Sequence, residues 1–199
     1  MVLGYHVIFG AYGFWLPNDS RGSWSDFVRS WEMFRFGPAT KVDTTRSVAR
    51  APHNRESRLE AKEALTYPPV QFTGAQARAV ARGFAASATR SRVRVWACSI
   101  LPEHVHLVIG QHTSKVESIV NCFKGDATKQ LVEEGIHSFL EHRSVDGKVP
   151  RCFAQREWKV FLDSPEDILR AVQYVEENPV KEGKRRQSWQ FVRPYDPLV

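Results

Sequence analysis

The stretch LPEHVHLVIG, residues 101–110, sets two histidines in an otherwise apolar run, with a single residue between them. Because side chains alternate along a strand, His104 and His106 point to one face of the expected sheet. The other face carries the apolar residues Val105, Leu107 and Ile109. The sequence therefore predicts a buried strand that holds two imidazoles on the same side.

The segments that flank this stretch predict further strands. Residues 92–101 alternate along a strand, and the tight connection through Pro102 and Glu103 predicts antiparallel pairing with the two-histidine strand. Residues 4–9 alternate polar and apolar side chains with β-branched content, and residues 156–162 are expected to form another strand.

Three helices with recognisable end residues are expected. They cover residues 74–90, capped by Thr73; residues 114–135, closed by Gly135; and residues 164–178, which start at Ser164 and end at Asn178-Pro179. The order strand, insertion, helix, strand, strand, helix, strand, helix predicts an α+β fold of the ferredoxin-like type, with helices flanking a central antiparallel sheet. The two-histidine strand is expected near the middle of that sheet.

The chain of 199 residues is expected to form one domain over residues 1–199. Between about 18 and 75 the sequence is irregular, with one short helix expected at 56–65, so we interpret it as an insertion or an extended loop region. Residues from about 180 to 199 are expected to form a basic tail.

The composition is that of a soluble globular protein, with 42% hydrophobic and 25% charged residues. No apolar run approaches the roughly 20 residues that cross a bilayer, so no membrane partner is expected. The apolar N-terminus has no basic region before it and predicts a strand rather than a secretion signal, which favours a cytoplasmic location. Three widely spaced cysteines suggest neither a disulfide framework nor a zinc knuckle. The formal net charge of +6 favours an anionic partner such as nucleic acid.

The two imidazoles allow two interpretations. Side chains at i and i+2 on a strand can reach one divalent ion together, and carboxylate, amide or water oxygens can complete a site for magnesium, manganese or zinc. Alternatively, one histidine faces solvent at a sheet edge while the other forms a hydrogen bond in the core. The spacing permits a metal ion without requiring one.

The last predicted helix carries Tyr174 and Asn178 just outside its apolar face. The two residues are i and i+4, so they are neighbours along the helix. A tyrosine at this border can project its hydroxyl over a sheet while the amide supplies a metal ligand. The alternative is that Tyr174 is an ordinary boundary aromatic residue and Asn178 only ends the helix.

In combination, three segments resemble a known family: PEHVHLVI at 102–109, FKGDATKQ at 123–130, and FAQREWKVFLDSPEDILRAVQYVEENPVKEG at 153–183. The chain resembles the single-tyrosine transposases of the HUH endonuclease superfamily, most closely the REP-associated tyrosine transposases. The resemblance covers about residues 92–192, and residues 5–9 match the family's first strand.

This resemblance implies a role for each motif residue. His104 and His106 would be metal ligands, Asn178 would complete the site of a Mg²⁺ or Mn²⁺ ion, and Tyr174 would be the catalytic nucleophile. The implied activity is that of a metal-dependent single-stranded DNA endonuclease and strand transferase. Such a transposase nicks next to a DNA hairpin through a covalent 5′-phosphotyrosine intermediate, and acts as a monomer or a homodimer in the nucleoid of the cytoplasm.

The chain departs from the family pattern at three carboxylates. Glu103 stands where an asparagine commonly precedes the first histidine, and Glu176 and Glu177 replace more neutral residues after the tyrosine. These departures affect the metal environment and the DNA contacts that the resemblance implies. No role is carried over to the segment from 18 to 75.

Basic and aromatic side chains are the expected DNA contacts, through charge and base stacking. The candidates are Lys181, Lys184, Arg185 and Arg186 after the last helix, together with Trp158 and Lys159. A merely solvated tail is the alternative for the four basic residues. Of the tryptophans Trp24, Trp31, Trp96, Trp158 and Trp189, at most one or two are expected to contact DNA.

Two other functions remain open from the sequence. The chain is an inactive or domesticated hairpin-binding protein if it keeps the fold but does not cleave. It is a zinc-dependent hydrolase if the histidine pair acts without Tyr174.

Overall fold

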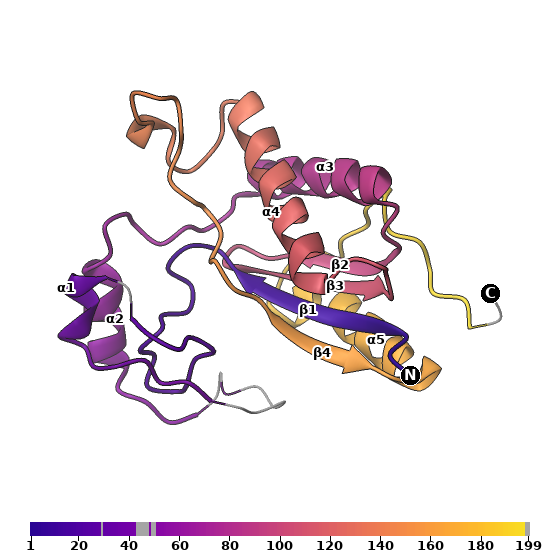
Figure 1. The fold of residues 1–199 in the computed structure, drawn as a ribbon, viewed down its shortest axis with the longest axis horizontal. Coiled ribbons are helices and arrows are strands. Elements are labelled where there is room, and N and C mark those ends of the chain that lie inside the picture. Colours follow the sequence, from indigo (N-terminus) through magenta and orange to yellow (C-terminus); the bar gives the residue numbers. More distant parts are fainter. Residues whose placement is uncertain (29, 43–47, 49–50, 198–199) are drawn as a thin grey trace.

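A four-stranded antiparallel sheet forms the centre of the computed structural model, which describes residues 1–28, 30–42, 48 and 51–197. The strands are β1 (Gly4–Gly10), β2 (Val95–Ile100), β3 (His104–Gly110) and β4 (Trp158–Leu162). They lie in the order β2-β3-β1-β4, so the two-histidine strand β3 is central (Figure 1). The four predicted strands and their antiparallel pairing are confirmed.

Three long helices cover the two faces of this sheet. Helices α3 (Gly74–Ser91) and α4 (Val116–Glu133) lie on one face, and α5 (Pro165–Lys181) lies on the other (Figure 1). The side chain of Thr73 accepts a hydrogen bond from the Gln76 N–H, and the Gln76 side-chain oxygen accepts one from the Thr73 N–H, which fixes the start of α3. The predicted ferredoxin-like α+β arrangement is therefore confirmed.

Several helix ends differ from the prediction, and two of them bear on the site. Helix α4 begins at Val116, after Lys115, instead of at Ser114. Helix α5 does not end at Asn178 but continues through Pro179 to Lys181. Proline removes one N–H bond and crowds the carbonyl four residues earlier, and here this cost falls in the final turn, two residues before the helix ends. Asn178 is thus a helical residue of the final turn.

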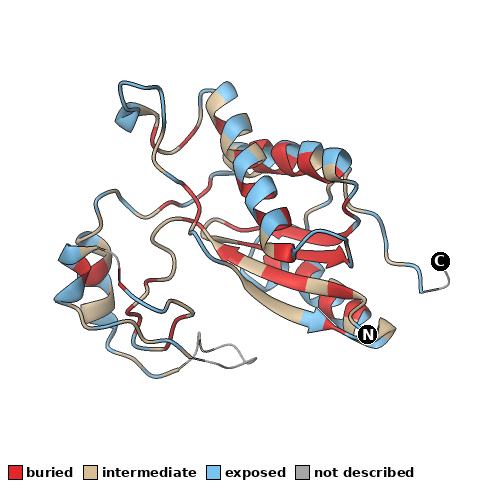
Figure 2. Ribbon diagram, in the orientation of Figure 1, coloured by how far each residue is buried: buried red, intermediate tan, exposed pale blue. Residues whose placement is uncertain are grey.

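The apolar side chains form a separate layer on each side of the sheet. Figure 2 marks buried residues along the strands and on the helices that cover them. The larger layer packs α3 and α4 against strand residues such as Phe9 and Leu107. The smaller layer packs Ile168, Ala171 and Val175 of α5 against the opposite face. Because α5 is held by this stripe, the residues that border the stripe have a fixed position over the sheet.

Gly83 is the point of closest approach between α3 and α4, since a Cβ there would lie 2.5 Å from the Ala127 Cα. We expect Gly83→Ala to destabilise the fold by about 1–3 kcal/mol through overpacking, which outweighs the helix-propensity gain of about 1 kcal/mol. The matched control is Gly125→Ala in α4, where no atom lies within 4 Å of the added methyl group. Urea unfolding should show the control to be as stable as the wild type or more stable. Stabilisation by both changes would contradict this close packing.

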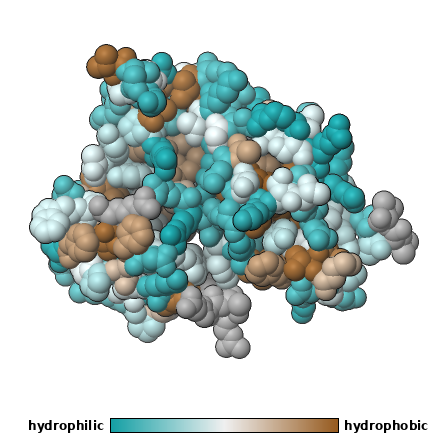
Figure 3. All heavy atoms as spheres, viewed as in Figure 1, coloured by the Kyte–Doolittle hydropathy of each residue, from teal (hydrophilic) through white to brown (hydrophobic). Residues whose placement is uncertain are grey.

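The predicted insertion forms a lobe beside the sheet (Figure 1). It contains the predicted short helix as α2 (Arg55–Glu63) and an additional short helix, α1 (Trp31–Phe34), which the sequence did not indicate. A small apolar cluster of its own joins the two helices, formed by Leu16, Val28, Met33 and Ala61. Figure 3 shows apolar side chains at the surface of this lobe, and the exposed ones include Phe34 and Leu59. Residues 29, 43–47, 49 and 50 of the insertion lie outside the described residues.

The C-terminal tail runs along the edge strand β2. The Gln187 side chain accepts a hydrogen bond from the Ile100 N–H and donates one to the Ile100 carbonyl oxygen. The Arg193 N–H donates to the carbonyl oxygen of Val95, and Trp189 packs against the larger apolar layer. The tail therefore covers an edge that would otherwise present unpaired backbone groups. The basic residues Lys184, Arg185 and Arg186 themselves stay exposed.

A short 3₁₀ helix, η1 (Leu140–His142), lies between α4 and β4. Within the described part of the chain, no helix combines the length and apolar character needed to span a membrane.

Candidate functional site

Strand β3 places the side chains of His104 and His106 on the sheet face that α5 covers. In the sheet register, His106 lies opposite Ile8 of β1 and His104 lies opposite Gly10. The two imidazole rings are adjacent, with centroids 4.9 Å apart. His106 is buried, and the side chain of His104 is 15% exposed. The predicted pair on one face is thus present, in the interior rather than at a sheet edge.

A third imidazole, which the sequence reasoning did not identify, completes this group. His6 of β1 is buried, and its Nε2 lies 3.0 Å from His106 Nδ1. One of these two nitrogens must carry the hydrogen. If the Nδ1–H of His106 donates to His6, the Nε2 lone pair of His106 stays free for a metal ion, as in most metal-binding histidines. His6 is therefore placed to set the tautomer of His106.

Burial keeps the three imidazoles neutral. It lowers the pKa of His6 to about 4 and that of His104 to about 4. Burial also lowers the pKa of His106, with smaller contributions from the neighbouring His104 and His6. All three rings are uncharged at neutral pH, and uncharged imidazole is the form that binds a metal ion.

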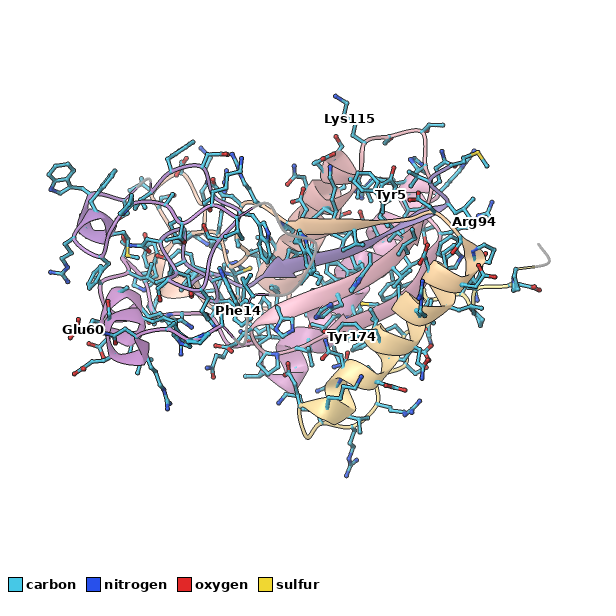
Figure 4. All side chains as sticks on the ribbon, turned by 90° about the horizontal axis from the view of Figure 1, so that it is seen from below. Tyr5, Phe14, Glu60, Arg94, Lys115 and Tyr174 are labelled. Carbon is cyan, nitrogen blue, oxygen red and sulfur yellow. The ribbon has the colours of Figure 1, made fainter. Side chains whose placement is uncertain are left out.

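Tyr174 extends from α5 to the same group of rings. Its ring centroid lies 5.6 Å from that of His106 and 5.7 Å from that of His6. Figure 4 shows Tyr174 between α5 and the sheet. The residue is 45% exposed, so a ligand in solution can reach it, and Lys181 Nζ lies 5.3 Å from the centre of the ring. The structure thus brings the predicted nucleophile together with the predicted histidines.

Asn178 lies one helical turn after Tyr174 and is buried, on the same stripe of α5 as Val175. The donor set of the expected ion is therefore two imidazoles and an amide. Within the described residues, no group of three or more His, Cys, Asp or Glu side chains is arranged to hold a metal ion. The buried Nδ1 of His104 has no hydrogen-bond partner, which leaves one ring nitrogen uncommitted. Neutral imidazoles with an uncommitted nitrogen fit a divalent ion.

Two further residues lie close to His104. Phe14, from the loop after β1, stacks on its ring with centroids 4.9 Å apart and 14° between the planes (Figure 4). Gly10 makes room for the Phe14 ring, since a Cβ at position 10 would lie 3.1 Å from Phe14 Cδ1. Glu182 Oε1 lies 3.7 Å from His104 Nε2. Neither Phe14 nor Glu182 was identified from the sequence.

The expected DNA contacts fall in different places. Trp158 shares the sheet face of His106 and stacks on Trp24 of the insertion, with centroids 5.3 Å apart and planes 5° from parallel. Lys159 points to the opposite face, where it pairs with Glu117 of α4. The structure therefore does not bring Lys159 to the histidine site.

The basic residues after α5 lie nearer to the site. Lys181 contacts the Tyr174 ring, and Lys184 lines a cavity beside His104. Arg185 and Arg186 are exposed. Of the remaining tryptophans, Trp96 and Trp189 pack against the apolar layers and Trp31 is 83% exposed on the insertion.

No family model and no curated protein sequence matches this chain. Among solved structures, the chain is similar to a REP-associated tyrosine transposase bound to a REP hairpin, with 13% identity and a TM-score of 0.49. The similarity covers 95% of this chain and 74% of the other. A candidate transposase from Deinococcus radiodurans R1 is also 13% identical, with a TM-score of 0.38 over 89% of this chain and 91% of that one.

Proposed function

We propose that the chain is a metal-dependent enzyme that cleaves and rejoins single-stranded DNA beside a hairpin, through a covalent bond to Tyr174. The observation that carries the proposal is the position of the Tyr174 ring beside the neutral rings of His106 and His6 on one sheet face. In this proposal His104, His106 and Asn178 hold a Mg²⁺ or Mn²⁺ ion. When bound, such an ion neutralises charge on the phosphate and stabilises the leaving oxygen.

The reaction makes one bond and breaks one. The Tyr174 hydroxyl oxygen attacks the phosphorus and loses its proton to water or a nearby base, while the bond from phosphorus to the 3′ oxygen breaks. The departing oxygen takes up a proton and becomes a free 3′-hydroxyl. The 5′-phosphate stays on Tyr174 as a phosphodiester, so another 3′-hydroxyl can displace the tyrosine and rejoin the DNA without ATP.

The surroundings of Tyr174 suit a flexible, anionic substrate. The ring is partly open to solvent on the sheet face, and a backbone held in a duplex does not bend easily into such a position. Lys181 beside the ring and the exposed Lys184, Arg185 and Arg186 after it offer positive charge to the phosphates. Single-stranded DNA next to a hairpin stem is therefore the proposed substrate.

The test is to incubate the protein with a labelled single-stranded hairpin oligonucleotide and Mn²⁺ or Mg²⁺. We expect a protein–DNA adduct that survives denaturation and is absent when EDTA is added. Hairpin binding without an adduct in either metal would favour the inactive binding protein. Cleavage that needs zinc and leaves no adduct would favour the hydrolase.

His6 is expected to act by positioning His106. Replacing a residue that orients a metal ligand typically costs 10- to 100-fold in metal affinity or activity, so we expect His6→Ala to raise the half-saturating Mn²⁺ concentration by about that factor. His6→Gln should restore much of the loss, because its amide oxygen can accept the same hydrogen bond from His106. The measurement is the rate of adduct formation against Mn²⁺ concentration. An unchanged half-saturating concentration in folded His6→Ala would contradict this role.

A further inference from the structure

A cavity of about 240 Å³ opens directly beside His104. Three segments that are distant in the sequence form it: the end of the insertion, the tight turn between β2 and β3, and the end of α5. The residues that line it are Gln71, Pro102, Glu103, His104, Glu182 and Lys184. The proposed cleavage reaction gives His104 and Lys184 a role but places no group in the cavity itself.

The position of the cavity limits what can enter it. His104 is both a wall of the cavity and a proposed ligand of the ion that binds the cleaved phosphate. A group in the cavity would therefore belong to a nucleotide next to the cleaved bond. Pockets that enclose drug-sized molecules measure about 300–1,000 Å³, so this smaller space has room for one compact group such as a single base.

The walls offer the hydrogen-bonding groups that recognise a base. Glu103 and Glu182 line the cavity. Lys184, and Lys62 with its Nζ 3.9 Å from Glu103 Oε1, offset part of their negative charge, so the case for a base rests on hydrogen bonding. The carboxylate oxygens accept hydrogen bonds, as they do from the exocyclic amino group of cytosine, and the amide of Gln71 can recognise adenine. Lys184 adds a donor for a ring nitrogen or a carbonyl oxygen.

We propose that this cavity is a subsite for the base beside the cleaved phosphodiester, and that it selects adenine or cytosine, through the N6 or N4 amino group, over thymine, which has no amino group. The proposal rests on the proposed function, because it takes the substrate to be single-stranded DNA. It assigns to Glu103 and Glu182 a role in sequence selection. Both carboxylates then contribute to the choice of target, although neither contacts the reacting atoms.

The test uses a fixed hairpin followed by a single-stranded flank of thymidines, in which one position at a time carries dA, dC or dG. Binding is measured by fluorescence anisotropy with Tyr174→Phe, so that cleavage does not intervene, and adduct rates are measured with the wild type. At one position of the flank we expect dA or dC to be favoured over dT by about 5- to 100-fold. Glu103→Ala and Glu182→Ala should each reduce this preference and leave the response to other positions unchanged.

The matched control is Glu176→Ala, which removes an exposed carboxylate of α5 that does not line the cavity. It should keep the wild-type preference. Equal binding of all four bases at every position, a preference that persists in both variants, or no binding to any oligonucleotide would overturn the proposal. Base-selective binding without an adduct would support the subsite and refute the proposed cleavage, so the two failures are distinguishable.

Discussion

Replacing Tyr174 by phenylalanine is expected to abolish the covalent adduct, with the rate of its formation falling by on the order of 10⁴-fold or more. The phenylalanine ring keeps the contacts with His106 and His6 but lacks the oxygen that attacks phosphorus. Because Tyr174 is 45% exposed, the loss of one hydroxyl should change the stability of the fold very little. Hairpin binding should therefore be retained, and a denaturing gel run beside an anisotropy titration separates the two effects.

Tyr5 provides the matched control for this substitution. It lies on β1 next to His6, yet its ring packs against the larger apolar layer on the opposite face of the sheet (Figure 4). Tyr5→Phe should form the adduct at the wild-type rate. If Tyr174→Phe still forms the adduct, or if Tyr5→Phe loses it, Tyr174 is not the nucleophile.

The parts of the site that follow from local periodicity could be predicted from the sequence. The two-residue period of a strand puts His104 and His106 on one face whatever the strand pairs with. The helical period puts Tyr174 and Asn178 one turn apart at the edge of an apolar stripe. These two rules, together with the positions of the helix ends, also predict the order of strands and helices.

His6 escaped prediction because its role depends on the register between β1 and β3. The bond to His106 joins residues on neighbouring strands that are diagonal to each other, since His6 lies opposite Val108 and Ile8 lies opposite His106. A shift of one residue in the pairing would turn His6 to the other face. The alternation of residues 4–9 already set His6 apart as a polar side chain in a strand, and that was the available signal.

The Glu182 contact and the course of the C-terminal tail also depend on long-range packing. Glu182 approaches His104 only because the helix continues past Pro179, and a proline after an asparagine is usually a sign that a helix ends. The tail looks polar and basic in sequence. Gln187 and the Arg193 backbone, which bond to β2, and Trp189, which packs on the larger apolar layer, form no periodic pattern. Neither feature has a local pattern from which it could be predicted.

Lowering the pH from about 6.5 to about 4 is expected to destabilise the metal-free protein by several kcal/mol. His6 and His104 have a pKa of about 4 in the folded chain, against about 6.5 in an unfolded chain. Between these values the unfolded chain binds more protons, so stability falls as the pH falls, by up to about 3 kcal/mol for each group. His106, whose pKa is also lowered, adds to the loss. The total is comparable with the net stability of a typical domain.

Other titrating groups also contribute to the pH dependence of stability, so a histidine variant is needed to isolate the effect of the site. Burial lowers the pKa of His137 as well, so part of the loss arises away from the site, whereas the raised pKa of Glu182 opposes it. Urea unfolding in EDTA at pH 7, 6, 5 and 4.5 measures how steeply the free energy of unfolding changes with pH. We expect the free energy of unfolding to depend less steeply on pH in His6→Gln, because glutamine does not titrate. If the free energy of unfolding falls equally with pH in the wild type and in His6→Gln, protonation of the buried His6 does not cause the acid destabilisation.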